Sequence, residues 1–375
     1  MKRVPMSHKK NTFHRSRLSA DFMVKFAFVV TFLVTISDSA NVNNQNLLEA
    51  ERRPEETLDD TDLVNYVNKN QKLWKAEFNE RYSSLNEVTR RNILGVRDVH
   101  LPNEAFSRLS RTRFSNISVP DTFDSREWWK ECKSIGSIRD QSSCGSCWAF
   151  GAAEAITDRI CIASRGTITP TISAEEILSC CDTCGYGCSG GYPLKAWDYW
   201  VENGIVTGGD YGTNVSRYQK NFTFQDTCQP YPFPSCHKHA NYSVPSQCSH
   251  APFATPKCSH ECNENYAQDF ERDKHFGMIS YGIEKDELTI RKELMKYGPI
   301  EVVFLVYTDF FHYRSGIYKH TAGLLAGGHA VKLIGWGKEH GTPYWLIANS
   351  WGNYWGDKGC SLCSVKFWVL GWLKN

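Results

Sequence analysis

All fifteen cysteines of this 375-residue chain lie after residue 131, and the first 131 residues contain none. Such a density is typical of a protein that folds in an oxidising compartment or that binds metal through thiolates. The spacings do not repeat as they do in zinc-binding modules, so disulfides explain them better, and we expect no metal site and no cofactor. Because the total is odd, at least one thiol must remain unpaired. Spacing alone does not give the connectivity of the others.

One of these cysteines, Cys147, stands at the head of a stretch that predicts a helix. Residues 141–150 read Gln-Ser-Ser-Cys-Gly-Ser-Cys-Trp-Ala-Phe, and residues 148–162 are rich in alanine and contain no proline. Apolar side chains recur there at three- and four-residue spacing, which is typical of a helix with one buried face. A thiol at a helix N-terminus lies near the positive end of the helix dipole, which favours the nucleophilic thiolate. Gln141 can offer its side-chain amide to the oxyanion that forms when a thiolate attacks a carbonyl.

Two residues near the C-terminus can serve such a nucleophile. A catalytic cysteine needs an imidazole that takes the thiol proton and later protonates the leaving amine, and His329, just before a strand predicted over 332–336, is the candidate. Asn349, directly after a second strand predicted over 344–348, can orient the imidazole ring, and Trp351 would cover that contact. Taken singly, each residue has a structural alternative, a buried or bridged cysteine and a half-buried histidine. The ordered set favours nucleophilic catalysis.

Residues 144–148 match Cys-Gly-[Ser/Ala]-Cys-[Trp/Tyr], the signature around the nucleophile of papain-like cysteine peptidases. The chain resembles that family and, within it, cathepsin B. The resemblance implies an α+β fold of two domains, a helical left domain that carries Cys147 and a β-barrel right domain that carries His329 and Asn349. These two residues follow the cysteine by 182 and 202 residues, more than the family's usual spacing of about 130–150, and an inserted loop accounts for the excess. The implied activity is hydrolysis of protein and peptide substrates through a thioester on Cys147.

The resemblance also divides the chain into three parts. Residues 1–40 are expected to be a leader, because residues 26–36 form an apolar run of signal-peptide size that is too short for a stable membrane span. Residues 41–118 contain no cysteine and resemble a cathepsin B propeptide, with an amphipathic helix or two over 58–78. In that family the propeptide crosses the active-site cleft backwards and blocks it, so we expect a zymogen. Residues 119–375 are the expected peptidase domain.

Location and partners follow from these parts. Translation from Met23 would give a signal peptide of usual form, and a signal anchor is the alternative. We expect the secretory pathway, with a lysosomal or extracellular destination, and the four sequons at Asn116, Asn214, Asn221 and Asn241 are candidate glycosylation sites. The formal net charge of +2 argues against a nucleic-acid binder. The expected partners are substrates, the chain's own propeptide as an inhibitor, and cystatin-like inhibitors.

Residues 228–262 are dense in proline, cysteine and histidine, which indicates a disulfide-bound surface loop. The alternative is a metal site built from His237, His239, His250 and His260, but the cysteine content fits disulfides better. The loop resembles the occluding loop of cathepsin B, in which His239 would bind the terminal carboxylate of a substrate and direct the removal of C-terminal dipeptides. Lys238 stands where the family has a histidine that pairs with an aspartate, here Asp140. Because lysine stays charged at neutral pH, we expect this loop to stay pinned there.

The resemblance assigns further contacts. Gly190 and Gly191 would pair with the main chain of an extended substrate, and the alternative is that they only relieve a crowded turn. Ala330 and Trp351 are the other expected substrate-binding residues. The resemblance implies six disulfides: Cys132–Cys161, Cys144–Cys188, Cys180–Cys258, Cys181–Cys184, Cys228–Cys262 and Cys236–Cys248. These pairs leave Cys147, Cys360 and Cys363 free.

The resemblance ends at Gly359. Residues 360–375 are unlike the final strands of the family, and the acidic residue at the floor of its main specificity pocket has no counterpart. A preference for arginine in that pocket is therefore unsupported. Two rival interpretations follow, an inactive homologue whose C-terminus compromises folding, and a secreted cysteine-rich binding module without catalysis.

Overall fold

The structure is a computed structural model in which the chain divides into two units, Met1–Pro54 and Glu55–Asn375. The described residues all belong to the second unit: 55, 57–98, 117–212, 227–235, 251–264, 266–364 and 368–372. The predicted leader, residues 1–40, lies outside them. Among the described helices, none has both the length and the apolar character that crossing a membrane requires.

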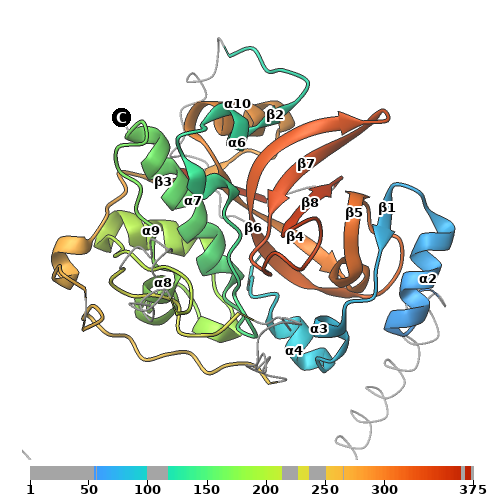
Figure 1. The fold of residues 1–375 in the computed structure, drawn as a ribbon, viewed down its shortest axis with the longest axis horizontal. Coiled ribbons are helices and arrows are strands. Elements are labelled where there is room, and N and C mark those ends of the chain that lie inside the picture. Colours follow the sequence, from blue (N-terminus) through green and yellow to red (C-terminus); the bar gives the residue numbers. More distant parts are fainter. Residues whose placement is uncertain are drawn as a thin grey trace, which may run out of the picture. The chain divides into compact units, whose positions relative to one another are not determined.

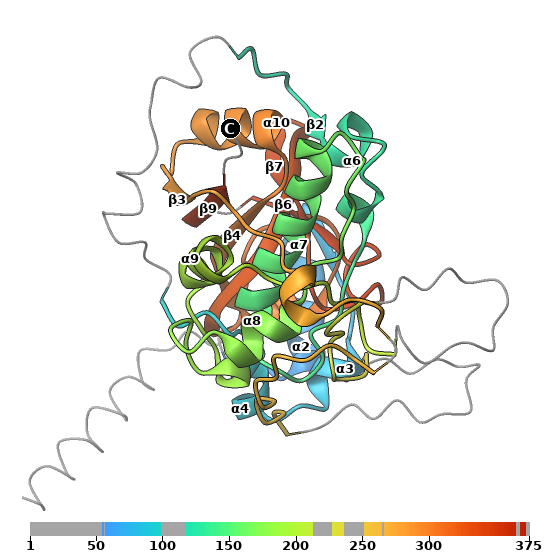
Figure 2. The ribbon, with the colours of Figure 1, turned by 90° about the vertical axis from the view of Figure 1, so that its left-hand side faces the viewer.

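The central helix is α7 (Cys147–Ala163), which begins at the predicted nucleophile and ends one residue beyond the predicted helix. On one side it contacts strands of the sheet, and on the other it contacts α8 (Ala174–Cys180) and α9 (Pro193–Asn203), as Figure 1 shows; Figure 2 gives the view from the helical side. A helix covered on both sides is expected to be apolar around most of its circumference, and alanine lets its neighbours approach closely. The helical side of the α+β fold is therefore built around the element that carries Cys147.

The described strands form one nine-stranded sheet beside these helices, in the order β1-β5-β8-β7-β6-β4-β9-β3, with β2 paired to β6 (Figure 1). Their bounds are β1 (Trp74–Ala76), β2 (Phe123–Asp124), β3 (Ser280–Ile283), β4 (Ile300–Tyr307), β5 (Tyr313–Tyr318), β6 (Leu325–Glu339), β7 (Thr342–Ala348), β8 (Cys360–Cys363) and β9 (Trp368–Trp372). All pairings are antiparallel except that of β5 with β8. The combination of helices and sheet is the predicted papain-like α+β arrangement.

The first predicted strand is longer than the sequence indicated. His329 and Ala330 were expected to precede a strand over 332–336, yet both lie inside β6. The small residues there have little intrinsic preference for strands. Hydrogen-bonded pairing with β4 stabilises the extended conformation instead, with Phe304 opposite His329 and Val303 opposite Ala330. His329 is consequently held on a central strand.

The unusual C-terminus also joins the sheet. Strand β8 lies between β5 and β7, and β9 lies between β4 and β3. Both strands therefore have partners on two sides, although their sequence is unlike that of the family's final strands. Of residues 365–375, only the backbone of β9 is described.

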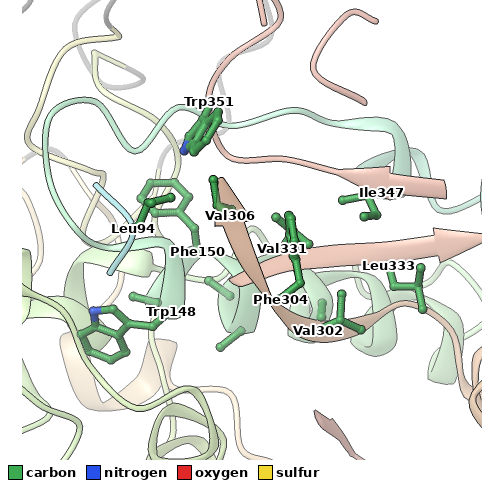
Figure 3. Close-up of a cluster of buried hydrophobic side chains, with 14 of the residues drawn as sticks. Leu94, Trp148, Phe150, Val302, Phe304, Val306, Val331, Leu333, Ile347 and Trp351 are labelled. Carbon is green, nitrogen blue, oxygen red and sulfur yellow. The ribbon is translucent and has the colours of Figure 1, made fainter. Parts of the chain in front are cut away.

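The helical and sheet layers share one buried cluster, which Figure 3 shows in part. Phe150 of α7, Phe304 of β4 and Val331 of β6 belong to it. Buried ion pairs add to this packing, since Lys332 Nζ of β6 lies 2.9 Å from an oxygen of Asp158 on α7. Such pairs are needed because an unpaired charge buried in this position would lower the stability of the fold.

The segment 57–98 packs on the same sheet. It contains α2 (Asp60–Asn70), α3 (Glu80–Ser83) and α4 (Glu87–Asn92), and β1 pairs with β5 at the sheet edge. The prediction of helix over 58–78 is therefore wrong beyond Asn70. Gln71 ends the helix, because its side-chain oxygen accepts hydrogen bonds from the backbone of Leu73 and Trp74.

Shorter elements complete the described fold. Helix α6 (Ser125–Trp128) follows β2, and α10 (Glu287–Tyr297) precedes β4. The 3-10 helices are η3 (Lys133–Gly136), η4 (Gly187–Ser189), η5 (Phe270–Asp273) and η6 (Thr308–His312).

Candidate active site

Cys147 is the first residue of α7 and has a free, buried thiol. The backbone N–H of Gly95 donates a hydrogen bond to its Sγ at 3.2 Å. Cys147 also lies in one buried apolar cluster with Ala330 on β6, the residue after His329. The cysteine of the helical side thus packs against the strand that carries the predicted imidazole.

His329 is fully buried and is oriented by Asn349. Its Nε2 lies 2.8 Å from Asn349 Oδ1, which also accepts a hydrogen bond from the backbone N–H of Ser350 at 2.8 Å. The ring of Trp351 lies 4.7 Å from the imidazole, centre to centre, and covers this contact. An Nε2–H that donates to the amide oxygen leaves Nδ1 as the nitrogen able to accept a proton, and within the described residues Nδ1 has no hydrogen-bond partner.

Burial favours the neutral form of both Cys147 and His329. Burial raises the pKa of the Cys147 thiol to about 12 and lowers the pKa of His329 to about 4. The sequence predicted a thiolate favoured by the helix terminus, and this expectation is wrong for the covered site. The physical reason is that loss of solvent outweighs the backbone N–H groups that face the sulfur.

Gln141 is also buried, and both ends of its amide are engaged. Its Nε2 donates to the carbonyl oxygens of Ile93 and Cys144, each at 2.8 Å, while its Oε1 accepts from Ser350 Oγ at 2.7 Å. The amide expected to stabilise an oxyanion therefore already binds a carbonyl oxygen of the 57–98 segment.

Residues 95–97 of the same segment run as an extended chain beside Gly191, one of the two glycines predicted to bind substrate. Gly191 N–H donates to Gly95 O at 2.8 Å, and Arg97 N–H donates to Gly191 O at 3.0 Å. On the other side, Val96 N–H donates to Gly328 O at 3.2 Å. The pairing of Val96 with Gly191 is parallel. Only glycine fits at position 191, because a Cβ there would lie 2.6 Å from the ring of Trp148.

Asp140 is paired within the structure, though its predicted partner is not described. Its carboxylate accepts from Arg81 of the 57–98 segment at 3.0 Å and from the backbone N–H of Ser142 at 2.8 Å. Lys238 and His239 lie outside the described residues, so the predicted Asp140–Lys238 pair and the carboxylate-binding role of His239 stay predictions.

The disulfides follow the pattern that the resemblance implies. Among the described cysteines, Cys147, Cys360 and Cys363 are free. The other described cysteines form five bonds: Cys132–Cys161, Cys144–Cys188, Cys180–Cys258, Cys181–Cys184 and Cys228–Cys262. Outside the described residues lie Cys236, Cys248 and the sequons at Asn116, Asn214, Asn221 and Asn241. Among the described residues, no group of three potential ligands is arranged to hold a metal ion, and of the four histidines weighed for a metal site only His260 is described.

Sequence reasoning missed the residues of the 57–98 segment that touch the site. Arg81, Ile93, Gly95 and Val96 carry no motif of their own, and their roles appear only when the chain is folded. The one available signal was the polar, cysteine-free character of the region, which indicated a separate segment without saying which residues make contact.

Comparisons with known proteins agree with this geometry. Residues 119–365 match the family described as papain family cysteine protease. The chain is 44% identical to cathepsin B-like cysteine proteinase 6 of Caenorhabditis elegans over 93% of both chains. It is 43% identical to a cathepsin B-like cysteine proteinase of Schistosoma japonicum over 90% of this chain and 93% of the relative. A solved structure, proCathepsin B S9 from Trypanosoma congolense, is similar with a TM-score of 0.68 and 33% identity, covering 86% of this chain and all of the other.

Proposed function

Because the chain belongs to the papain family of cysteine proteases, and within it to the cathepsin B-like proteins, we propose that it hydrolyses peptide bonds with Cys147, His329 and Asn349 as its catalytic residues. The observation that supports this assignment most directly is the 2.8 Å contact between His329 Nε2 and Asn349 Oδ1, beside Ala330, which shares a buried cluster with Cys147. A nucleophile, a base and an oriented amide are the three parts that such a reaction needs.

The proposed reaction begins when the thiol proton moves to His329 Nδ1 and the sulfur attacks the scissile carbonyl carbon. The negative oxygen that forms is stabilised by Gln141 Nε2 and by the backbone N–H of Cys147. The imidazolium then protonates the leaving amine and a thioester remains. Water, deprotonated by the same imidazole, attacks the thioester, releases the acid and restores the thiol.

The chain is proposed to be made as a zymogen, with residues 41–118 as an inhibitory propeptide and residues 119–375 as the enzyme. Support comes from the path of residues 93–97, which occupy the Gln141 amide, the Cys147 thiol and the main-chain groups of Gly191. These are the groups that the reaction needs, so a substrate and the propeptide exclude one another. Removal of the segment returns solvent to the site and so makes the thiolate accessible.

Three finer assignments rest on the resemblance. We propose that His239 binds a terminal carboxylate and adds dipeptide removal from C-termini to endopeptidase activity. We also propose passage through the secretory pathway to a lysosomal or extracellular location, which the disulfides support because such bonds persist in oxidising compartments. Cystatin-like proteins are the proposed inhibitors.

A thiol-trapping epoxide tests the catalytic assignment. Protein processed at acid pH should be modified at Cys147 alone, while the intact chain and the Cys147→Ser variant should stay unmodified. Mass spectrometry of the products from one defined peptide at pH 5 tests the exopeptidase proposal, since dipeptide removal gives a ladder that descends by two residues. Modification of Cys360 or Cys363 in place of Cys147 would overturn the catalytic assignment.

A further inference from the structure

Both backbone polar groups of Gln141 are held by distant parts of the chain. Its N–H donates to the carbonyl oxygen of Ser350 at 2.8 Å, and its carbonyl oxygen accepts from the hydroxyl of Tyr231 at 2.8 Å. Gln141 and Tyr231 are 0% and 2% exposed, so solvent does not compete for the bond between them. The position of the proposed oxyanion donor is therefore fixed by two residues that lie 209 and 90 positions away in the sequence.

The same hydroxyl contacts the residue before the nucleophile. Tyr231 Oη lies 2.8 Å from Oγ of Ser146, which precedes Cys147. A tyrosine hydroxyl has one proton, and the bond to the Gln141 carbonyl uses it, so Ser146 donates to Tyr231. The ring also packs edge-on against Phe150 of α7, at 4.7 Å from centre to centre. Tyr231 thus contacts both sides of the proposed oxyanion hole, the residue that supplies the Gln141 amide and the neighbour of the Cys147 backbone N–H.

The turn that follows Gln141 needs such support. Ser142 has a φ of 56°, in the left-handed region that is unfavourable for residues other than glycine. A residue stays in this region only where its surroundings hold it there. On the other side of the turn, Ser143 O accepts from the backbone N–H of Phe253 at 3.1 Å. Tyr231 and Phe253, from the two described ends of the disulfide-bound loop, therefore hold the turn on either side.

We propose that Tyr231 is a positioning residue for peptide hydrolysis, and that its hydroxyl holds the Gln141 amide where the negative oxygen of the reaction forms. An oxyanion donor is effective when its hydrogen is already aimed at the place that the charged oxygen will occupy. Tyr231 touches no reacting group, so it acts through Gln141. The disulfide-bound loop therefore supports the catalytic machinery, in addition to its predicted effect on substrate choice. This inference rests on the proposed peptidase function.

Tyr231→Phe tests this role, because it removes the hydroxyl and keeps the ring. We expect kcat on a peptide amide substrate to fall about three- to tenfold, the range for one buried hydrogen bond between neutral groups, while KM changes less than about twofold. The rate at which iodoacetamide alkylates Cys147 should stay unchanged, because that reaction forms no negative oxygen on a carbonyl carbon. Tyr281→Phe is the matched control, since its buried hydroxyl bonds Glu293 and its loss should lower stability without changing kcat.

A mutant cycle shows whether Tyr231 acts through Gln141. In the Gln141→Ala background, Tyr231→Phe should lower kcat no further, since the amide that the hydroxyl positions is absent. Titration of each variant with a thiol-trapping epoxide gives the concentration of folded, reactive enzyme, so that partial misfolding does not enter the value of kcat. An unchanged kcat in Tyr231→Phe, an equal loss in the rate of alkylation, or additive losses in the cycle overturns the positioning role.

Propeptide binding gives a readout that needs no catalysis. Gln141 Nε2 donates to the carbonyl oxygen of Ile93 at 2.8 Å, so displacement of the amide weakens this contact. With the processed Cys147→Ser protein, Tyr231→Phe should weaken binding of the separate 41–118 segment by about two- to fivefold, and it should have no effect beside Gln141→Ala. Equal losses in both backgrounds overturn the inference. If no variant cleaves any peptide, the proposed function fails, and this cycle still decides whether Tyr231 positions the Gln141 amide.

Discussion

The guanidinium of Arg81 donates hydrogen bonds to both carboxylate oxygens of Asp140, at 3.0 and 3.3 Å, although the two residues are 59 positions apart. A third bond, to the backbone oxygen of Trp351, measures 2.9 Å. The side chains are only 14% and 6% exposed. The carboxylate that the sequence suggested would hold an occluding loop is thus occupied by the 57–98 segment, which makes this pair an anchor of the proposed propeptide.

Replacing Arg81 by alanine should loosen this anchor. Loss of one partner of a buried, hydrogen-bonded charge pair costs about 2 kcal/mol or more, which weakens binding of the propeptide about 30-fold or more. The inhibition constant of the separate propeptide for the processed enzyme measures this. Arg91→Ala is the matched control, because Arg91 pairs with Glu87 on an exposed helix surface and should change the constant little. Equal effects of the two substitutions would contradict the assignment of Arg81 as the anchor.

Acid pH should release the propeptide through His329. Burial lowers the pKa of this imidazole to about 4 in the covered site, against about 6.5 when it is exposed. As the pH falls below 6.5, the uncovered enzyme gains a proton that the covered enzyme binds only near pH 4, so dissociation becomes more favourable. Calorimetry between pH 4.5 and 6.5 should show that the affinity of the propeptide for the enzyme decreases as the pH falls, by up to about tenfold per pH unit.

Two comparisons isolate that effect. His329→Gln should flatten the pH dependence, whereas His340→Gln, at a residue that is 93% exposed, should leave it unchanged. Asp60 should not contribute in this range. Although its burial acts in the opposite direction, the neighbouring His312 imidazole and hydrogen bonds from Arg90 hold the pKa of its carboxyl well below the usual range, so it stays charged throughout this interval. A dependence that survives His329→Gln would reject this account.

Asn349→Ala should lower kcat by about 100-fold and leave KM nearly unchanged. The amide oxygen fixes the imidazole through the 2.8 Å contact, and a base that turns away loses much of the benefit of general acid–base catalysis. Asn349→Asp keeps an acceptor oxygen and should retain more activity than alanine. Steady-state kinetics on processed protein measures both, and a wild-type kcat for the alanine variant would remove Asn349 from the mechanism.

Local pattern was sufficient to predict α7 and the position of Cys147 at its start, because helix periodicity and alanine content are properties of neighbouring residues. The same reasoning missed the beginning of β6, where His329 lies among small residues and the strand depends on pairing with β4. It also missed Arg81, since nothing near this residue in the sequence indicates a partner 59 positions away. Five disulfides could be anticipated only through the family resemblance, because spacing does not determine pairing.

The protonation state of the site is the clearest difference between expectation and structure. A helix N-terminus favours a thiolate, yet burial raises the pKa of the Cys147 thiol to about 12 in this site, where Gly95 lies against the sulfur. No local feature of the sequence conveys that burial. The sequence therefore predicted the chemistry of an uncovered enzyme, whereas the structure describes the covered one.

Lys332→Ala should destabilise the fold strongly. Its ammonium lies 2.9 Å from Asp158 and 3.7 Å from Glu154, and all three side chains are at most 4% exposed, so its loss removes the ion-pair partner of two buried carboxyl groups. The expected cost is about 3–5 kcal/mol, seen as a fall in Tm of about 10 °C. Lys130→Ala, which breaks an exposed pair with Glu127, is the control and should cost less than about 1 kcal/mol.

The stability lost in Lys332→Ala should depend on pH, which tests whether the charge of Lys332 is responsible. Burial already raises the pKa of Glu154 to about 7, and removal of Lys332 takes away a charge that opposes this rise. In the variant the buried carboxyl groups therefore gain stability by binding protons, and the deficit relative to wild type should be smaller at pH 5 than at pH 8. Urea denaturation at the two pH values measures the difference. A deficit that is equal at both would mean that Lys332 acts through packing of its alkyl chain and not through its charge.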